Sequence, residues 1–356
     1  MGAEPLSILV TGAGAPGIRG TLYALRSNPE QRPVRIVGVD MDDDVVGRFL
    51  VDAFFQVPPP ESPAYLDAIR SICRQEGASL ILPQTTREVV VLSRWKEELE
   101  RDSLRIMVSD EQAIELANNK WTLLVRCQEL GLPCPAFHIA GSEDELVGCV
   151  RKLGYPAQPV VVKPLVSNGM RGFRVLRSES WDVLRFLAEK PPCGETSLDD
   201  LLRILRRGPG WPQLLVTEYL PGPEYSVDVF LGEKLAVALP RLRKSIRSGI
   251  TFRSQTELRQ DMVSFSLCVA RDIGLRYAFG FQFKLDADSV PRILECNPRI
   301  QGTMVASVFS GANVIWFGVK ELIGESVCRL DCRPAPSSFY RYWGGLGVRD
   351  GNATEI

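Results

Sequence analysis

The chain has 356 residues, 45% of them hydrophobic and 24% charged, so it can bury two or three domain-sized cores. Its 42 basic and 43 acidic residues leave a net charge of −1, which argues against the strongly basic face that nucleic-acid-binding proteins need. The uncharged stretch 301–319 contains Gln, Thr, Asn, Ser and Gly, so it predicts a buried, broken helix and no membrane span.

The first hundred residues alternate strands with helices, which predicts a parallel sheet ending near Ser109. The expected strands are 7–11, 34–39, 79–83 and 105–108, and the expected helices end near residues 27, 76 and 101. A glycine turn (Gly12 to Gly20) follows the first strand and Asp40 follows the second, as in a Rossmann unit. Because Pro16 interrupts this turn, two interpretations stay open: a dinucleotide site, or a turn that only packs a helix against the sheet.

Two helices follow this sheet. Ser109 and Asp110 are good capping residues for the first, and the second, which follows Lys120, ends near Leu130 because Gly131 and two prolines come next.

Short strands dominate from residue 160 onward, at 160–164, 173–176, 214–219, 225–231 and 235–240, with an insertion at 191–212 that holds a short helix. Lys163 lies in the first of these strands and is followed by a loop containing Gly169 and Gly172. A lysine ammonium and the backbone N–H groups of such a loop can together hold phosphate oxygens.

A strand, a tight turn and a second strand follow in Glu218-Tyr-Leu-Pro-Gly-Pro-Glu224. A hinge of this kind can present backbone groups to an adenine edge and place Glu224 near ribose hydroxyls. The basic run Arg241 to Arg253 comes next, and it has two open interpretations: a solvated loop or an anion-binding segment.

The most informative stretch is Glu295-Cys-Asn-Pro-Arg299, which closes a strand beginning near Pro291. Side chains alternate along a strand, so a hairpin with the preceding strand 279–286 brings Gln282, Glu295 and Asn297 to one face and turns Cys296 away. Hard oxygen ligands beside an arginine suit magnesium carrying nucleotide phosphates.

Histidine and cysteine usage argues against several enzyme classes. His138 is the one histidine of the sequence and is interpreted as structural, which argues against serine hydrolases, cysteine proteases and other chemistry that needs a histidine base. The nine cysteines contain no C-x-x-C, and the close pair Cys328 and Cys332 lacks histidines, so we expect free thiols in a reducing cytosol. With no signal peptide visible, a cytoplasmic location is expected.

In their order and spacing, V-V-V-K-P with its glycine loop, E-Y-L-P-G-P-E-Y, and G-F-Q-F…L-E-C-N-P-R resemble the ATP-grasp superfamily. Within it, the chain is similar to one half of a carbamoyl-phosphate synthetase large subunit, over roughly residues 6–324. The resemblance implies an α/β Rossmann-like domain (1–109), which in this family usually holds no dinucleotide, before an α+β ATP-grasp domain (110–330). That domain has two subdomains clasping ATP, with a small lid at about 135–218; residues 331–356 form an extension, expected to be frayed after Gly344.

The resemblance also implies ATP and Mg²⁺ as cofactors, with Mn²⁺ able to substitute, and a role for each matching residue. Phosphates would be bound by Lys120 and Lys163, under a loop containing Gly169 and Gly172. Adenine would lie by Glu218, Tyr219 and Leu220, and ribose by Glu224. The metal ligands would be Gln282, Glu295 and Asn297, and Arg299, assisted by Arg243, would stabilise the transferring phosphoryl group. The loop is poorer in glycine than in many relatives, and Cys296 stands where an aliphatic residue is common.

These roles predict an ADP-forming carbon–nitrogen ligase, in which a carboxylate is activated as an acyl phosphate and an amine then displaces phosphate. The expected partners are a small carboxylate, such as an amino acid, and an amine, with no nucleic acid and no membrane; a homodimer is the family-like state. Three alternatives stay open: a bicarbonate-activating enzyme that makes carboxyphosphate or carbamoyl phosphate, a non-catalytic nucleotide-binding module, and a dinucleotide-linked oxidoreductase.

Overall fold

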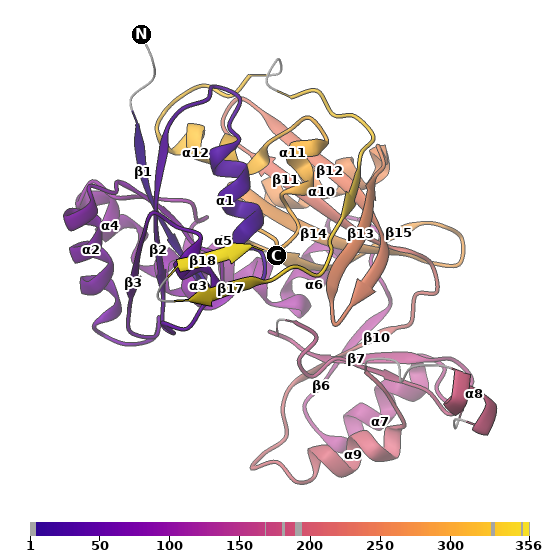
Figure 1. The fold of residues 1–356 in the computed structure, drawn as a ribbon. Coiled ribbons are helices and arrows are strands. Elements are labelled where there is room, and N and C mark those ends of the chain that lie inside the picture. The colour runs from indigo at the N-terminus through magenta and orange to yellow at the C-terminus, as the bar shows by residue number, and fades with distance from the viewer. Residues whose placement is uncertain are drawn as a thin grey trace.

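The computed structural model describes residues 5–167, 169–179, 182–188, 194–328, 332–349 and 352–355. Its strands form four sheets: a parallel N-terminal sheet, a small sheet set apart from the body, a larger antiparallel sheet and a C-terminal two-stranded ribbon (Figure 1). The mixed α/β class and the N-terminal parallel sheet expected from the sequence are confirmed.

The N-terminal sheet has five parallel strands in the order β3 (Ala53–Gln56), β2 (Val34–Asp40), β1 (Leu6–Thr11), β4 (Leu80–Leu82) and β5 (Arg105–Ile106). Its helical elements are α1 (Ile18–Arg26), the 3₁₀-helix η1 (Val46–Phe49), α2 (Tyr65–Glu76), α3 (Thr86–Arg94) and α4 (Lys96–Arg101). Alternate residues of β1 enter the cores on opposite faces of the sheet, which explains its continuous apolar run.

Two details of this sheet differ from the sequence prediction. Strand β3 and η1 were not expected, because a four-residue edge strand carries little periodicity. The helix expected to end near residue 101 is divided at Trp95, whose backbone (φ −103°, ψ 9°) separates α3 from α4.

Helices α5 (Glu111–Asn118) and α6 (Lys120–Glu129) connect this sheet to the next. Asn119 divides them, because its side-chain oxygen accepts the backbone N–H groups of Trp121 and Thr122 and so starts α6. Lys120 is therefore the first residue of α6, and its own backbone N–H donates to Leu165 O at 2.9 Å.

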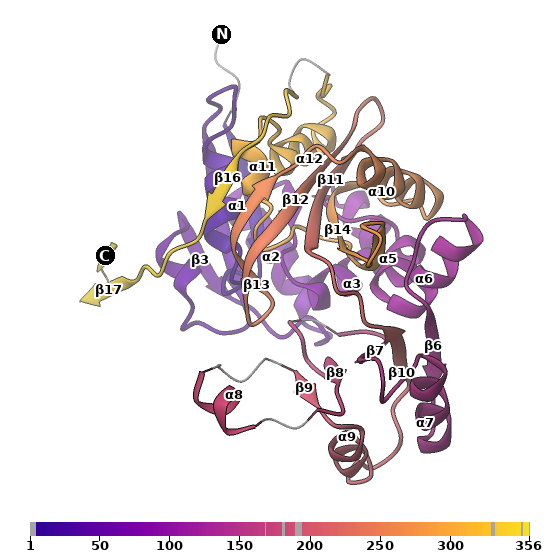
Figure 2. The same ribbon diagram turned by 90° about the vertical axis from the view of Figure 1, so that its right-hand side faces the viewer.

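The small sheet has the strand order β6 (Phe137–Ala140), β10 (Leu214–Glu218), β7 (Val160–Pro164), β8 (Arg174–Leu176) and β9 (Glu195–Thr196). Helices α7 (Glu143–Lys152) and α9 (Leu198–Leu205) share one apolar core with it, and α8 (Val183–Ala188) lies at its far end (Figures 1 and 2). This unit lies within the range expected for the lid. The half-buried His138 of β6 lies in register with Val216 of β10.

The larger sheet is antiparallel, in the order β15 (Pro291–Asn297), β14 (Tyr277–Leu285), β11 (Glu224–Leu231), β12 (Ala236–Arg247), β13 (Ile250–Thr256) and β16 (Ser338–Tyr340). One face packs on α5, α6 and α10 (Gln260–Asp272) through an apolar core. The opposite face meets α12 (Val314–Leu322) and the N-terminal sheet through another apolar core, and it also carries the buried polar pair Asp228 and Arg241.

The basic run 241–253 is a β-hairpin, so its interpretation as a solvated loop is wrong. β12 extends seven residues beyond the strand end expected at 240, and it pairs with β13 from Arg241 to Arg247. The extension is stable because Arg241 and Arg243 find carboxylate partners on β11.

The C-terminal part contains the expected broken helix, as α11 (Ala306–Phe309) followed by α12. Within the described part of the chain, no helix is long and apolar enough to cross a membrane. The frayed tail expected after Gly344 is wrong, because β17 (Leu346–Arg349) pairs with β18 (Asn352–Glu355), where Glu355 forms an ion pair with Arg19 of α1.

Candidate functional site

The predicted metal ligands lie on paired positions of β14 and β15. Gln282 is opposite Glu295 and Gly280 is opposite Asn297, so the three side chains share one face as the alternation predicted. A β-bulge follows, since Phe283 pairs with Ile293 and leaves Leu294 outside the register. The bulge was not predicted. It leaves Leu294 outside the strand pairing, so the Leu294 carbonyl can bind a side chain.

Both predicted phosphate lysines converge on this bulge. Lys120 Nζ lies 3.3 Å from a carboxylate oxygen of Glu295 and donates to Ser167 O at 3.0 Å. Lys163 Nζ donates to Leu294 O, the carbonyl at the bulge, at 3.4 Å. Two ammonium groups and one carboxylate therefore occupy one small region, although they come from α6, β7 and β15.

Lys163 is the most perturbed of these groups. Its side chain is buried, and this burial lowers the pKa of Lys163 from 10.5 to about 8, with Lys120 lowering it further while Glu295 and Glu224 raise it. Because burial disfavours the charged form of Lys163, a nearby anion would stabilise its ammonium strongly. The pKa change therefore favours a ligand of negative charge at this place.

Arg299 joins the cluster to the N-terminal sheet. Its guanidinium donates to Asn297 Oδ1 at 3.3 Å and to Thr86 Oγ1, in the first turn of α3, at 3.1 Å. Burial lowers the pKa of Arg299, while Glu295 and Glu88 raise it. The guanidinium is thus desolvated and fixed beside the predicted metal ligands, as an electrostatic catalyst requires.

The predicted adenine residues form the connection between the small sheet and the larger one. The Glu218 carboxylate, at the end of β10, accepts the backbone N–H of Ala136, just before β6, at 2.8 Å, so it ties the end of β10 to the start of β6. Leu220 is buried, and the Tyr219 ring lies 5.2 Å from the guanidinium carbon of Arg177. The backbone of 218–220 thus remains the predicted partner for adenine.

The glycines of the predicted phosphate loop adopt conformations that favour glycine. Gly169 has φ +60° and Gly172 has φ +74°. A Cβ on Gly172 would lie 2.6 Å from Cγ of Pro164, so the loop returns tightly onto the end of β7. This proximity keeps the loop beside Lys163.

Sequence reasoning missed a buried ion pair under the site. Arg241 donates to both carboxylate oxygens of Asp228, at 2.6 and 2.9 Å, and both side chains are fully buried. The same guanidinium donates to Thr303 Oγ1 at 3.2 Å. Arg241 therefore fixes the segment just after Arg299, and only the register of β11 with β12 could have revealed it.

A second missed residue is Gln301. Its side chain lies against Gly280, since a Cβ there would be 2.0 Å from Gln301 Nε2. That nitrogen is buried and has no hydrogen-bond partner among the described residues. Because Gly280 is opposite Asn297, the amide lies next to the predicted metal ligands.

The N-terminal glycine turn is a packing element in this structure. A Cβ on Gly17 would lie 2.6 Å from Cα of Gly302, and Gly14 N–H donates to Asp40 Oδ2 at 2.7 Å. Asp40 thus holds the turn, and the turn abuts the segment after Arg299. Of the two interpretations left open for this turn, the geometry favours packing.

The donor set fits magnesium only together with other ligands. Gln282, Glu295 and Asn297 supply one carboxylate and two amide oxygens, and no group of three or more histidine, cysteine, aspartate and glutamate side chains that could hold a metal occurs within the described ranges. Mg²⁺ commonly takes one or two carboxylates and completes its coordination with phosphates and water. The residues therefore fit a metal that shares a phosphorylated ligand.

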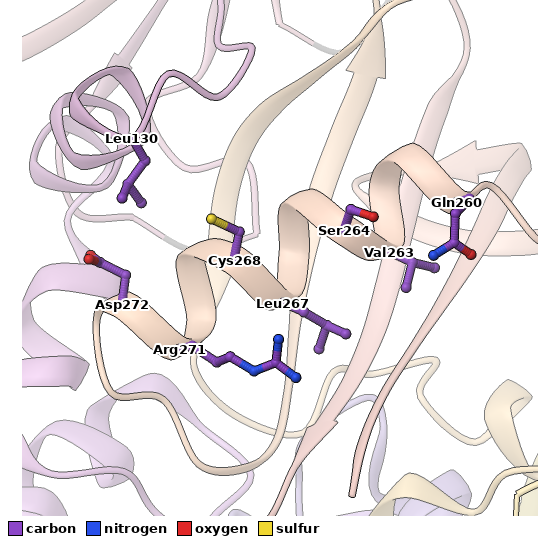
Figure 3. Close-up of a pocket in the computed structure, with 8 residues that line it drawn as sticks. All are labelled: Leu130, Gln260, Val263, Ser264, Leu267, Cys268, Arg271 and Asp272. Carbon is purple, nitrogen blue, oxygen red and sulfur yellow. The ribbon is translucent and has the colours of Figure 1, made fainter.

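Two hollows lie away from this cluster. One, of about 690 Å³, runs along the outer side of α10, where Leu130, Cys268 and Arg271 line it (Figure 3). The other, of about 410 Å³, lies between Glu100 and Tyr277. None of the predicted site residues lines either hollow, so neither is the candidate site.

Comparisons with known families agree with this arrangement. Residues 211–339 match the family described as ATP-grasp in the biosynthetic pathway with Ter operon, and residues 8–107 match the PylC-like N-terminal domain.

Among curated proteins, the carbamoyl phosphate synthase large chain of Rubrobacter xylanophilus is 26% identical over 328 residues, which are 89% of this chain and 27% of the relative. A formate-dependent phosphoribosylglycinamide formyltransferase of Oleidesulfovibrio alaskensis is 31% identical over 112 residues, covering 32% of this chain and 27% of that one. The chain spans about a quarter of the length of these relatives.

Solved structures share the fold over almost the whole chain. N5-carboxyaminoimidazole synthetase from Staphylococcus aureus, complexed with ADP, has a TM-score of 0.69 at 15% identity, covering 92% of this chain and 80% of that one. L-amino acid ligase from Bacillus licheniformis has a TM-score of 0.64 at 15% identity, covering 98% and 83%. At these identities the likeness establishes the fold.

Proposed function

We propose, from the premise that this chain is an ATP-grasp protein resembling one half of a carbamoyl phosphate synthase large chain, that it is an ATP-dependent carboxylate–amine ligase. It would use ATP with Mg²⁺ and release ADP and phosphate. The observation that carries the proposal is the convergence of Lys120, Lys163 and Glu295, with Arg299 fixed beside Asn297.

In the proposed reaction, a carboxylate oxygen of the acid attacks the γ-phosphorus of ATP, and the bond from that phosphorus to the bridging oxygen of ADP breaks. The nitrogen of the amine then attacks the acyl carbon, phosphate leaves with the acyl C–O bonding electrons, and the nitrogen loses a proton. Lys120 and Lys163 offset phosphate charge, and Arg299 donates to the phosphoryl oxygens as charge develops. The assistance of Arg243 remains a prediction.

Glu295 and Asn297, with Gln282, would hold Mg²⁺ together with the phosphates, and the ion would neutralise charge on the transferring group. Glu295 would then give up its contact with Lys120, which would release one donor of the Lys120 ammonium for a phosphate, while the donation to Ser167 O remains. The protein needs no covalent nucleophile. Cys296 is unsuited to be one, because burial raises the pKa of its thiol well above 9.0 and its side chain lies in the core of the opposite face.

Bicarbonate is a second candidate acid, since one structure with the same fold is the biotin carboxylase domain of a 2-oxoglutarate carboxylase from Hydrogenobacter thermophilus in complex with MgADP and bicarbonate. The nucleotide residues would be the same for bicarbonate as for an organic acid. The buried arginines near the site favour an anionic substrate but do not choose between them.

The test is Mg²⁺-dependent ADP release from ATP, screened with amino acids singly and in pairs, with and without bicarbonate. ADP release that requires one acid and one amine supports the ligase, whereas release with bicarbonate alone moves the enzyme to carboxyphosphate chemistry. MgATP binding without release under any condition supports the non-catalytic module. Lys163→Ala should weaken MgATP binding, and Lys152→Ala, an exposed lysine of α7, is its matched control.

A further inference from the structure

The tip of the β12–β13 hairpin is a two-residue turn with a fixed backbone. Arg247 pairs with Ile250, and the residues between them, Ser248 and Gly249, have φ +47° and +77°. Positive φ at both central positions is the type I′ pattern, which matches the twist of the flanking strands. The turn therefore presents the Gly249 carbonyl in one defined direction.

Arg243 uses that carbonyl as one of three anchors. Its Nη2 donates to Gly249 O at 2.6 Å, its Nε donates to Thr251 Oγ1 at 2.8 Å, and its Nη1 forms an ion pair with Glu224 Oε1. The Arg243 side chain is 4% exposed. Two anchors thus lie on its own hairpin, and the third reaches the neighbouring strand.

Two cations lie within electrostatic range of the Glu224 carboxylate. Lys163 is near enough that Glu224 raises the pKa of its ammonium, whereas Arg243 contacts the carboxylate directly. A carboxylate released by Arg243 would be attracted toward Lys163, at the predicted phosphate end of the site. The planar guanidinium of Arg243 is fixed through Nε and Nη2, so its Nη1 holds the Glu224 carboxylate in one direction and prevents this movement.

The same turn touches the predicted phosphate loop. A Cβ placed on Gly249 would lie 3.0 Å from Cγ and 3.3 Å from Sδ of Met170. Met170 itself has φ +61° and lies between Gly169 and Gly172. The predicted phosphate loop is therefore linked to Glu224 by a chain of neighbouring residues: Met170 lies beside Gly249, Gly249 accepts from Arg243, and Arg243 pairs with Glu224.

We propose that Arg243 is a positioning residue that orients Glu224, and that this orientation gives the site its preference for ribose over deoxyribose nucleotides. The inference rests on the proposed function, because it takes Glu224 as the group that accepts the ribose hydroxyls. This positioning role acts through Glu224 and through the turn, and it is separate from the predicted assistance of Arg243 to Arg299. A lysine in its place would keep the positive charge but would lose the planar set of donors that contacts three partners at once.

The experiment measures the dissociation constants of MgATP and of its 2′-deoxy and 3′-deoxy analogues by calorimetry. The unmodified protein should prefer MgATP over at least one analogue by about tenfold, the worth of one hydrogen bond to a charged acceptor. In Arg243→Lys, the ratio of the analogue's dissociation constant to that of MgATP should fall toward one. Arg253→Lys, an exposed arginine that stacks on Tyr340, is the matched control and should keep the ratio.

Two further variants separate positioning from a general loss of structure. Glu224→Gln should also lose the preference, and adding Arg243→Lys to it should change the ratio no further, because both act on one interaction. Thr251→Val removes one anchor of Arg243 and should give an intermediate ratio, which keeps the test available if Arg243→Lys does not fold. Thermal unfolding of each variant identifies damage to the fold, which would alter all three affinities together.

Absence of MgATP binding to the unmodified protein would overturn the proposed function. Binding without any ribose preference, or a preference that Arg243→Lys and Thr251→Val leave intact, would overturn the positioning role of Arg243 alone.

Discussion

The buried ammonium of Lys163 makes the affinity for MgATP depend on pH. Because its pKa is about 8 in this structure, the free protein loses the Lys163 charge above that pH, while bound phosphates favour the charged form. Binding above pH 8 must therefore take up a proton. The association constant should fall by about tenfold per pH unit from pH 8 upward, and it should change little between about pH 7 and 7.5.

The stability of the free protein should change in the opposite direction. The folded-state pKa of about 8 lies below the ordinary 10.5, so between these values the unfolded chain binds more protons than the folded one. Stability therefore rises as pH rises through this window. A pKa lowered from 10.5 to about 8 corresponds to a cost of about 3 kcal/mol, which is fully present below pH 8 and relieved as Lys163 loses its proton.

Calorimetry from pH 7 to 9.5, in pairs of buffers with different ionisation enthalpies, measures both the affinity and the proton uptake. A phosphate has its second pKa at about 6, so the ligand contributes little titration in this range. Lys163→Arg and Lys163→Met provide the controls, because the first stays charged and the second stays neutral, and both should bind with constant affinity. An affinity of the unmodified protein that does not change across this range, with no proton uptake, would refute the reasoning.

Three substitutions test the rest of the site. Glu295→Gln should lower Mg²⁺-dependent ADP release by about 10²–10³-fold in a coupled assay, and unchanged release would contradict the metal assignment. Asp228→Ala leaves the fully buried Arg241 without its carboxylate and should cost about 3–5 kcal/mol in urea unfolding, so a loss below 1 kcal/mol would show that the pair is not structural. Gly280→Ala places a Cβ 2.0 Å from Gln301 Nε2 and should destabilise the fold by about 1–3 kcal/mol, whereas a neutral effect would show that the amide can move aside.

The sequence was sufficient to place the three predicted metal ligands on one face of a hairpin, because strand alternation is a local property. Gln282, Glu295 and Asn297 were expected on one face, and the pairing of β14 with β15 confirms it. The bulge at Leu294 could not be predicted from the sequence, because an extra residue in one strand is visible only when the two strands are aligned. The sequence therefore did not predict the carbonyl that accepts from Lys163, although it predicted that both lysines lie at the site.

The arginines of the basic run show the opposite case. A row of positive charges is typical of a solvated loop, and the sequence left that interpretation open. Their partners, Asp228 and Glu224, lie on another strand, 13 and 19 residues away. Pairing at such separations depends on how β11 aligns with β12, and no local pattern encodes that alignment.

The position of His138 has a practical consequence for spectroscopy. The sequence has one imidazole, and it is half-buried on β6, in the small sheet that carries Lys163. Its ring C–H protons give a single pair of histidine signals in a proton NMR spectrum, so an unlabelled sample contains a native reporter on that sheet. The protein can thus be titrated with nucleotide, without an engineered label, while the surroundings of the small sheet are followed at one atom pair.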